Sequence, residues 1–291
     1  MARQKPAGKD FVDVLGVKMA YLDRGKGRPV LFLHGNLTSS FLWRNVIEAL
    51  QDQVRCVAPD LIGMGDSAKV GHGPRSYRFI DHRTYLDAFI EILELGEGLI
   101  LVGHEWGATL GFDWAMRHPA SPSGFVYMET LVGPLEYHQI PEPEQTIIRA
   151  IRGEDGEDLV LHKNVPLEKL LPFSTDNPLG QEAIAEYLRP FREVGESRRA
   201  LLSWYRELPV GGSPATVVEL AERIADYMET AHQPKLFVNG APGRFLVGHQ
   251  RETCRRWFNQ TEVRVPGKHL LPEESGPAIG RVIGEWLDHI S

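Results

Sequence analysis

Six residues decide the fold of this chain: Val102-Gly103-His104-Glu105-Trp106-Gly107. They lie between the apolar run Leu99–Val102 (LILV) and Trp106–Arg117, a stretch with helical spacing and many small residues. A strand, a sharp turn and a helix, with glycines on both sides of one central residue, are typical of a nucleophile elbow. The glycines allow the strand and the helix to approach closely. The pattern places Glu105 where a nucleophile stands; the simpler alternative is an ordinary acidic residue in a first helical turn.

Outward from this turn, short apolar strands alternate with helical stretches. The expected strands are Val17–Leu22, Pro29–Leu33, Arg55–Ala58, Leu99–Val102, Phe125–Met128, Lys235–Val238 and Glu262–Val265. This alternation predicts an α/β fold with a mostly parallel central sheet and helices on both faces.

The alternation stops after Glu129, and up to about Pro214 the chain shows only helical segments separated by prolines. We therefore expect residues 1–130 and 215–291 to form an α/β core and residues 131–214 to form an inserted helical cap. Insertions of this length usually cover a binding site.

Two further residues fit the chemistry of the elbow. Glu129 ends the strand that follows the elbow helix, and His269 comes just after the last expected strand. The chain order is then nucleophile, acid, base, as this kind of site requires. We expect Glu105, Glu129 and His269 to form a catalytic triad, in which Glu129 orients His269 and His269 acts as a base that titrates near neutral pH.

Composition excludes several other classes of protein. Thirty-two basic and 39 acidic side chains give a net charge of −7, which does not favour nucleic acid or an anionic membrane. No apolar stretch reaches the roughly 18 residues of a membrane helix. Two cysteines, Cys56 and Cys254, predict buried thiols in a cytoplasmic protein. No complete nucleotide-binding loop and no metal-binding spacing is found, so we expect neither a cofactor nor a metal.

Several long blocks resemble the haloalkane dehalogenases, in the branch that also contains the Renilla-type luciferases. The blocks are HGNLTSSFLWRNVI (34–47), APDLIGMGDS (58–67), SYRFIDH (76–82), VGHEWG (102–107), GESRR (195–199) and SWYRELP (203–209). The resemblance covers nearly the whole chain. It implies an α/β-hydrolase fold with a helical cap over a buried, mostly apolar cavity.

The resemblance also implies a reaction and a set of roles. In that family a carboxylate displaces halide from carbon to give an alkyl-enzyme ester, and a water activated by histidine hydrolyses this ester. Glu105 stands at the nucleophile, His269 would be the base and Glu129 its orienting acid. Asn36 and Trp106 would hold the departing halide. The expected partners are a small apolar, halogenated substrate and a halide ion.

The chain departs from the family at Glu105, where the displacing members carry aspartate. The extra methylene is expected to push the carboxylate oxygens about an ångström or more towards the halide donors. Three outcomes are open: Glu105 still displaces halide, it acts as a general acid or base on another substrate, or the pocket only binds. A cofactor-independent oxygenase of the Renilla type is a further alternative. Some aromatic residues of the insertion are expected mostly in the core, with one or two on the cavity wall; examples are Phe173, Phe191, Trp204 and Tyr205.

Overall fold

The structure, a computed structural model, describes residues 8–142 and 144–290. Their strands form one eight-stranded sheet in the order β1-β2-β4-β3-β5-β6-β7-β8. Only the pairings of β2 with β1 and β4 are antiparallel, and the other neighbours are parallel. The strands are β1 (Asp10–Val14), β2 (Val17–Arg24), β3 (Pro29–Leu33), β4 (Arg55–Pro59), β5 (Leu99–His104), β6 (Pro122–Met128), β7 (Lys235–Pro242) and β8 (Gln260–Gly267). The expected α/β fold with a mostly parallel sheet is confirmed.

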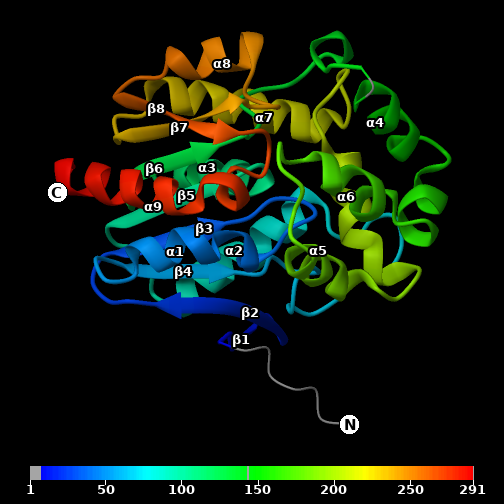
Figure 1. The fold of residues 1–291 in the computed structure, drawn as a ribbon, viewed down its shortest axis with the longest axis horizontal. Helices are drawn as coiled ribbons and strands as arrows, with labels where there is room; N and C mark the ends of the chain where they lie inside the picture. The colour runs from blue at the N-terminus through cyan, green and yellow to red at the C-terminus, as the bar shows by residue number, and fades with distance from the viewer. Residues whose placement is uncertain (1–7, 143, 291) are drawn as a thin grey trace.

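Helices cover both faces of the sheet. The main ones outside the insertion are α1 (Arg44–Leu50), α2 (Phe79–Ile92), α3 (Trp106–Arg117), α7 (Ala215–Thr230), α8 (Gly248–Arg255) and α9 (Leu271–His289). Helices α1 and α9 pack against each other on the face turned to the viewer in Figure 1, whereas α2, α3 and α7 pack together behind the sheet. The central strands β3 and β5 are almost wholly buried because both of their faces are covered.

One strand was missing from the sequence prediction. Strand β1 was not predicted, because its Asp10 and Asp13 interrupt the apolar pattern of a short edge strand. The chain ends in the long helix α9, which begins at Leu271. It continues across a kink at Ser275, whose hydroxyl donates to the carbonyl of Pro266 over 2.7 Å. The kink lets Pro277 sit near the start of a helical stretch, where a missing N–H is tolerated.

Between β6 and α7 the described residues form helices and isolated bridges only. These elements are η2 (Tyr137–Gln139), α4 (Glu144–Arg152), η3 (Asp158–His162), η4 (Pro166–Leu170), η5 (Leu171–Phe173), α5 (Gln181–Leu188), η6 (Arg189–Phe191), η7 (Glu196–Arg198) and α6 (Arg199–Glu207). Figure 1 shows α4, α5 and α6 together at one end of the sheet. An ion pair between Arg189 and Asp66 ties this segment to the core over 2.6 Å, and Lys9 joins Asp66 over 2.9 Å.

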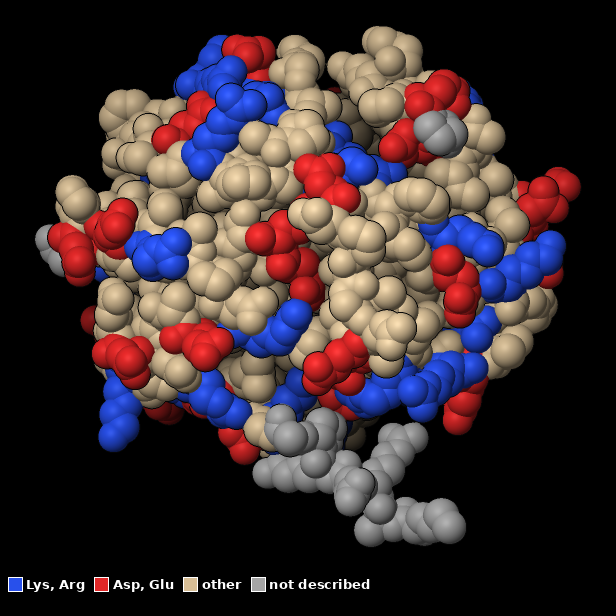
Figure 2. All heavy atoms as spheres, viewed as in Figure 1, with Lys and Arg blue, Asp and Glu red and all other residues tan. Residues whose placement is uncertain are grey.

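The surface carries no single dominating charge on the face drawn in Figure 2. Acidic and basic side chains are interspersed there, in keeping with the modest net charge of −7. The same face is hollowed between the regions of α4 and α8. Among the described helices, none is both long enough and apolar enough to cross a membrane.

Candidate active site

The turn between β5 and α3 holds Glu105 in a strained backbone conformation, with φ 54° and ψ −128°. Such angles are rare for a residue with a side chain and concentrate at functional sites. The flanking glycine is required for close packing: a Cβ on Gly107 would lie 2.1 Å from the carbonyl oxygen of Leu33. The helix therefore begins directly against β3, and Glu105 is presented at the carboxyl end of the sheet, where open α/β sheets bind their ligands.

One oxygen of the Glu105 carboxylate is held by two backbone N–H groups. Oε2 accepts from the N–H of Asn36 over 2.7 Å and from that of Trp106 over 2.8 Å. Gly35 leaves room for this arrangement, since a Cβ there would lie 2.3 Å from Oε2. The longer side chain therefore reaches a pair of donors suited to an oxyanion. Oε1 accepts no hydrogen bond from the described residues and is not one of their enclosed unpartnered atoms, so it faces the cavity.

Burial makes Glu105 a weak acid. Desolvation raises its pKa from 4.5 to about 7, although the N–H groups of Trp106 and Asn36 favour the charged form. A carboxylate with this pKa is more basic than a solvated one, and a large part of its population is ionised at neutral pH.

Glu129 and His269 meet beside this carboxylate. Glu129 directly follows β6, and its Oε2 lies 3.4 Å from Nδ1 of His269. The same oxygen accepts from the backbone N–H of Arg244 over 2.9 Å and of Phe245 over 2.8 Å. The loop after β8 that carries His269 is fixed by the inserted segment, because the N–H of His269 donates to the carbonyl of Ser174 over 3.0 Å. The expected trio is thus brought together at the ends of β5, β6 and β8.

The sequence analysis predicted that His269 titrates near neutral pH, and this prediction is wrong. Burial, and secondly the positive charge of Arg244, lower the pKa of His269 to about 3. Burial raises the pKa of Glu129 to about 7, against the backbone donors of Phe245 and Arg244. His269 is therefore a neutral base across the physiological range, and the ionisations near pH 7 belong to the two glutamates. The sequence could not show this, because the shifts come from burial.

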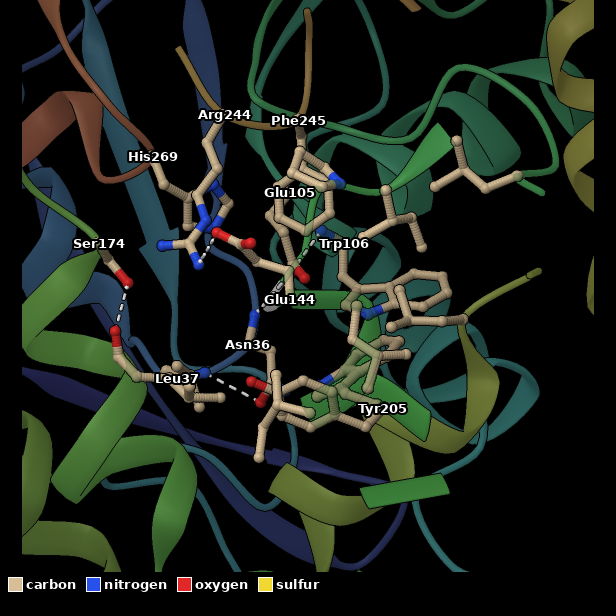
Figure 3. A pocket seen from close by; sticks show the side chains of 18 of the residues that line it. Asn36, Leu37, Glu105, Trp106, Glu144, Ser174, Tyr205, Arg244, Phe245 and His269 are labelled. Atoms are coloured by element: carbon tan, nitrogen blue, oxygen red, sulfur yellow. Dashed lines mark hydrogen bonds and ion pairs between the residues drawn. The ribbon is translucent and has the colours of Figure 1, made fainter. Parts of the chain in front are cut away.

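Asn36 and Trp106 lie on the same cavity wall as Glu105 (Figure 3). The side chain of Asn36 is fixed at both ends: Oδ1 accepts from the N–H of Leu37 over 2.9 Å, and Nδ2 donates to Leu201 over 3.3 Å. The indole of Trp106 stacks on Trp204 with ring centroids 4.8 Å apart. One N–H of the Asn36 amide and the indole N–H have no partner among the described residues.

The cavity has a volume of about 120 Å³. Aliphatic side chains from the core and the insertion make up much of its wall: Leu37, Leu135, Ile147, Ile148, Leu170, Leu208 and Leu270. Of the four aromatic residues named from the sequence, Trp204 and Tyr205 line the cavity, Phe191 is buried elsewhere, and Phe173 is 68% exposed. The sequence indicated that one or two would line the cavity but could not choose between them.

Arg244 is a site residue that the sequence analysis missed. It lines the cavity, and Figure 3 shows it beside His269 and joined to Glu144. Its guanidinium donates to Glu144 on α4 over 2.9 Å and to the carbonyl of Phe173 over 3.1 Å. Its position in a loop after β7 carries no sequence signal, because its role depends on the insertion folding over it. The described residues contain no cluster of side chains able to hold a metal ion.

A strained carboxylate at the β5–α3 turn, a neutral histidine and a second carboxylate place the chain among hydrolases of the α/β class. Residues 28–172 match the family model described as alpha/beta hydrolase fold. Within that fold the chain belongs to the haloalkane dehalogenase family, as its 45% and 42% identity to two haloalkane dehalogenases shows.

Relatives support this over nearly the full length. The chain is 45% identical to a haloalkane dehalogenase of Sphingobium indicum, covering 97% of this chain and 96% of the relative. It is 38% identical to the coelenterazine h 2-monooxygenase of Renilla reniformis, over 96% of this chain and 90% of the relative. The crystal structure of haloalkane dehalogenase DbeA from Bradyrhizobium elkani superposes with a TM-score of 0.91 at 34% identity, covering 97% and 98% of the two chains. The chain is a haloalkane dehalogenase-like hydrolase.

Proposed function

We propose that the protein hydrolyses small halogenated alkanes through an ester on Glu105. Oε1 of Glu105 attacks the carbon that carries the halogen, the carbon–halogen bond breaks, and the halide leaves with the bonding electron pair. The free N–H groups of Asn36 and Trp106 stabilise the developing halide in a site with little water. Residues 131–214 act as the cap that covers this cavity.

The second step uses His269. Its neutral imidazole takes a proton from a water molecule, which attacks the carbonyl carbon of the ester. The resulting negative charge develops on Oε2, where the N–H groups of Asn36 and Trp106 already lie 2.7 and 2.8 Å away. Glu129, in its ionised form, stabilises the imidazolium that forms. The bond between the ester oxygen and the carbonyl carbon breaks, the alcohol leaves and the Glu105 carboxylate is restored. The proton on His269 then passes to solvent.

The two backbone hydrogen bonds to Oε2 of Glu105 are the observation that carries the proposal. An acid or base acting alone needs no pair of backbone donors on one of its oxygens. A nucleophile that becomes an ester needs them, because one oxygen must attack while the other receives charge in the next step. Glu105 makes both hydrogen bonds although its side chain is one methylene longer than aspartate.

Intact-protein mass and halide release after incubation with 1,2-dibromoethane or 1-iodohexane test this function. We expect halide release by the wild-type protein, with an alkyl adduct during turnover. Glu105→Asp is the matched comparison, because it keeps the carboxylate and removes one methylene. If the wild type releases no halide and Glu105→Asp does, displacement is not the reaction of this chain. Non-displacement chemistry, with Glu105 as acid or base, then replaces it.

The rate of ester formation should follow the ionisation of Glu105. A protonated carboxyl is a poor nucleophile, so the single-turnover rate of halide release should rise with pH and level off above about pH 7 to 8. At pH 5 it should be about 100-fold below the plateau, as a pKa of about 7 requires. The same rise of the single-turnover rate with pH should be seen in His269→Gln. If the rate of that variant no longer depends on pH, the ionisation belongs to His269 instead.

Replacing Trp106 by phenylalanine should lower the rate of halide release about 10²- to 10³-fold, because one donor to the leaving halide is lost. The backbone N–H that holds Oε2 and most of the ring stacked on Trp204 remain. Trp43→Phe is the control: the indole N–H of Trp43 is enclosed without a partner among the described residues, and its ring packs on Phe32 in the core. Equal losses in the two variants would show a packing effect and contradict the role of Trp106.

A second candidate is a cofactor-independent oxygenase, favoured by the 38% identity to the Renilla reniformis monooxygenase. Light emission on mixing with coelenterazine, without halide release from either alkane, would support it. Halide release without light supports the dehalogenase.

We infer a cytoplasmic location. The two cysteines, Cys56 and Cys254, are free and buried, and burial raises the pKa of each thiol to about 12. Inert, unpaired thiols are compatible with a reducing compartment.

A further inference from the structure

The phenol of Tyr205 is a cavity group that halide displacement does not use. Tyr205 belongs to α6 of the inserted segment, and Figure 3 shows it across the pocket from His269 and Arg244. Its hydroxyl makes no hydrogen bond with the described residues and is not one of their enclosed unpartnered atoms. It is therefore open to the cavity that Tyr205 lines.

Tyr205 is held near the nucleophile through its neighbour in sequence. Trp204 stacks on Trp106, the residue next to Glu105, so this turn of α6 has a fixed position relative to the nucleophile. Burial, and then the negative charge of Glu105, raise the pKa of Tyr205. The phenol thus stays protonated at neutral pH, and its O–H group is available to donate.

A protonated phenol matters for a leaving group that halide chemistry does not include. Halide leaves as a stable anion and needs no proton. An oxygen that leaves carbon as an alkoxide is strongly basic and needs a proton as the bond breaks. The amide of Asn36 and the indole of Trp106 donate hydrogen bonds but are not acids. Glu144 is paired with Arg244. Tyr205 is therefore the cavity group suited to protonating an alkoxide.

We propose that the same site opens epoxides, with Tyr205 as the acid that protonates the ring oxygen. Oε1 of Glu105 forms a bond to a ring carbon, the carbon–oxygen bond of the ring breaks, and its electron pair stays on the oxygen, which takes the proton of Tyr205. The product is a hydroxyalkyl ester of Glu105 and a tyrosinate. This inference rests on the proposed function, because the same carboxylate is the nucleophile.

Hydrolysis of the ester completes the reaction and regenerates the enzyme. His269 takes one proton from water, and the hydroxide cleaves the ester to give a 1,2-diol and the Glu105 carboxylate. The proton on His269 returns to the tyrosinate. The net reaction is epoxide plus water to 1,2-diol, without an oxidant or reductant.

The test compares 1,2-epoxyhexane with 1-iodohexane in the wild type and in Tyr205→Phe. We expect the wild type to form a covalent adduct with each, and to release the diol and iodide respectively. In Tyr205→Phe the ratio of diol formation to iodide release should fall at least 10²-fold. Tyr21→Phe, where the ring packs on Phe89 away from the cavity, is the matched control and should keep the wild-type ratio. Glu105→Gln gives the background hydrolysis of the epoxide.

The outcomes separate the two proposals. An adduct with 1-iodohexane but none with the epoxide overturns the epoxide activity and leaves the dehalogenase reaction standing. An adduct with neither overturns the proposed function itself. Diol formation with an unchanged ratio in Tyr205→Phe overturns the role of Tyr205 as the acid.

Discussion

His269→Gln should release one halide per active site and then stop. Glu105 still attacks, because its two backbone donors do not involve His269, but the water that must hydrolyse the ester loses its base. Steady-state turnover of 1-iodohexane should fall about 10²- to 10⁴-fold, the range for loss of a general base. The alkyl-enzyme ester should accumulate and be seen as a stable increase in intact mass.

A burst of halide equal to the enzyme concentration, measured by rapid quench, is the second readout. His118→Gln is the matched control, because His118 follows α3 at the end of that helix away from Glu105, where its ring stacks on Trp114 and its Nδ1 lies 2.9 Å from the Trp114 carbonyl oxygen. Full turnover by His269→Gln would exclude the two-step scheme. A variant without burst and without adduct would show that His269 is needed before the displacement.

Glu105→Gln should abolish ester formation and stabilise the fold at alkaline pH. The amide is not a nucleophile, so halide release should fall at least 10⁴-fold, to the background rate. Its oxygen can still accept from the N–H groups of Asn36 and Trp106, so the turn is kept. The role proposed for Glu105 therefore implies a cost in stability, as is common where an active site buries a charge.

The sign of the stability effect follows from the raised pKa. A carboxyl with a pKa of about 7 in the folded state and 4.5 when unfolded binds its proton more tightly when folded. At pH 4 this carboxyl does not lower the free energy of unfolding, because it is protonated in both states. As the pH rises from about 4.5 to 7, it lowers the free energy of unfolding progressively. Removing the charge should add about 3 kcal/mol to the free energy of unfolding at pH 8 and almost nothing at pH 4.

Urea unfolding at the two pH values measures this difference. Glu97→Gln, at an exposed position, is the control for the loss of one acidic group. A gain of equal size at pH 4 and pH 8 would mean that the variant improves packing. No gain at either pH would show that Glu105 is ionised in the folded state without penalty.

The sequence by itself determined the local parts of this site. Glycines at 103 and 107, an apolar strand before them and a helix of small residues after them suffice to specify the elbow, because the strand–turn–helix geometry is short-range. The positions of Glu129 and His269 at strand ends followed from the alternation of strands and helices, since parallel strands bring their carboxyl ends to one edge.

The tertiary structure alone decided the contacts and the burial of these residues. The donors to Oε2 of Glu105 include the N–H of Asn36, 69 residues away in the chain, and Gly35 leaves the space for the extra methylene. The near-neutral pKa of Glu105 and the low pKa of His269 come from burial, which no local pattern encodes. Arg244 and Tyr205 became cavity residues because the insertion folds over the sheet. Local spacing fixes which residues stand at the strand ends, whereas long-range packing fixes their solvation and contacts, and these set the chemistry.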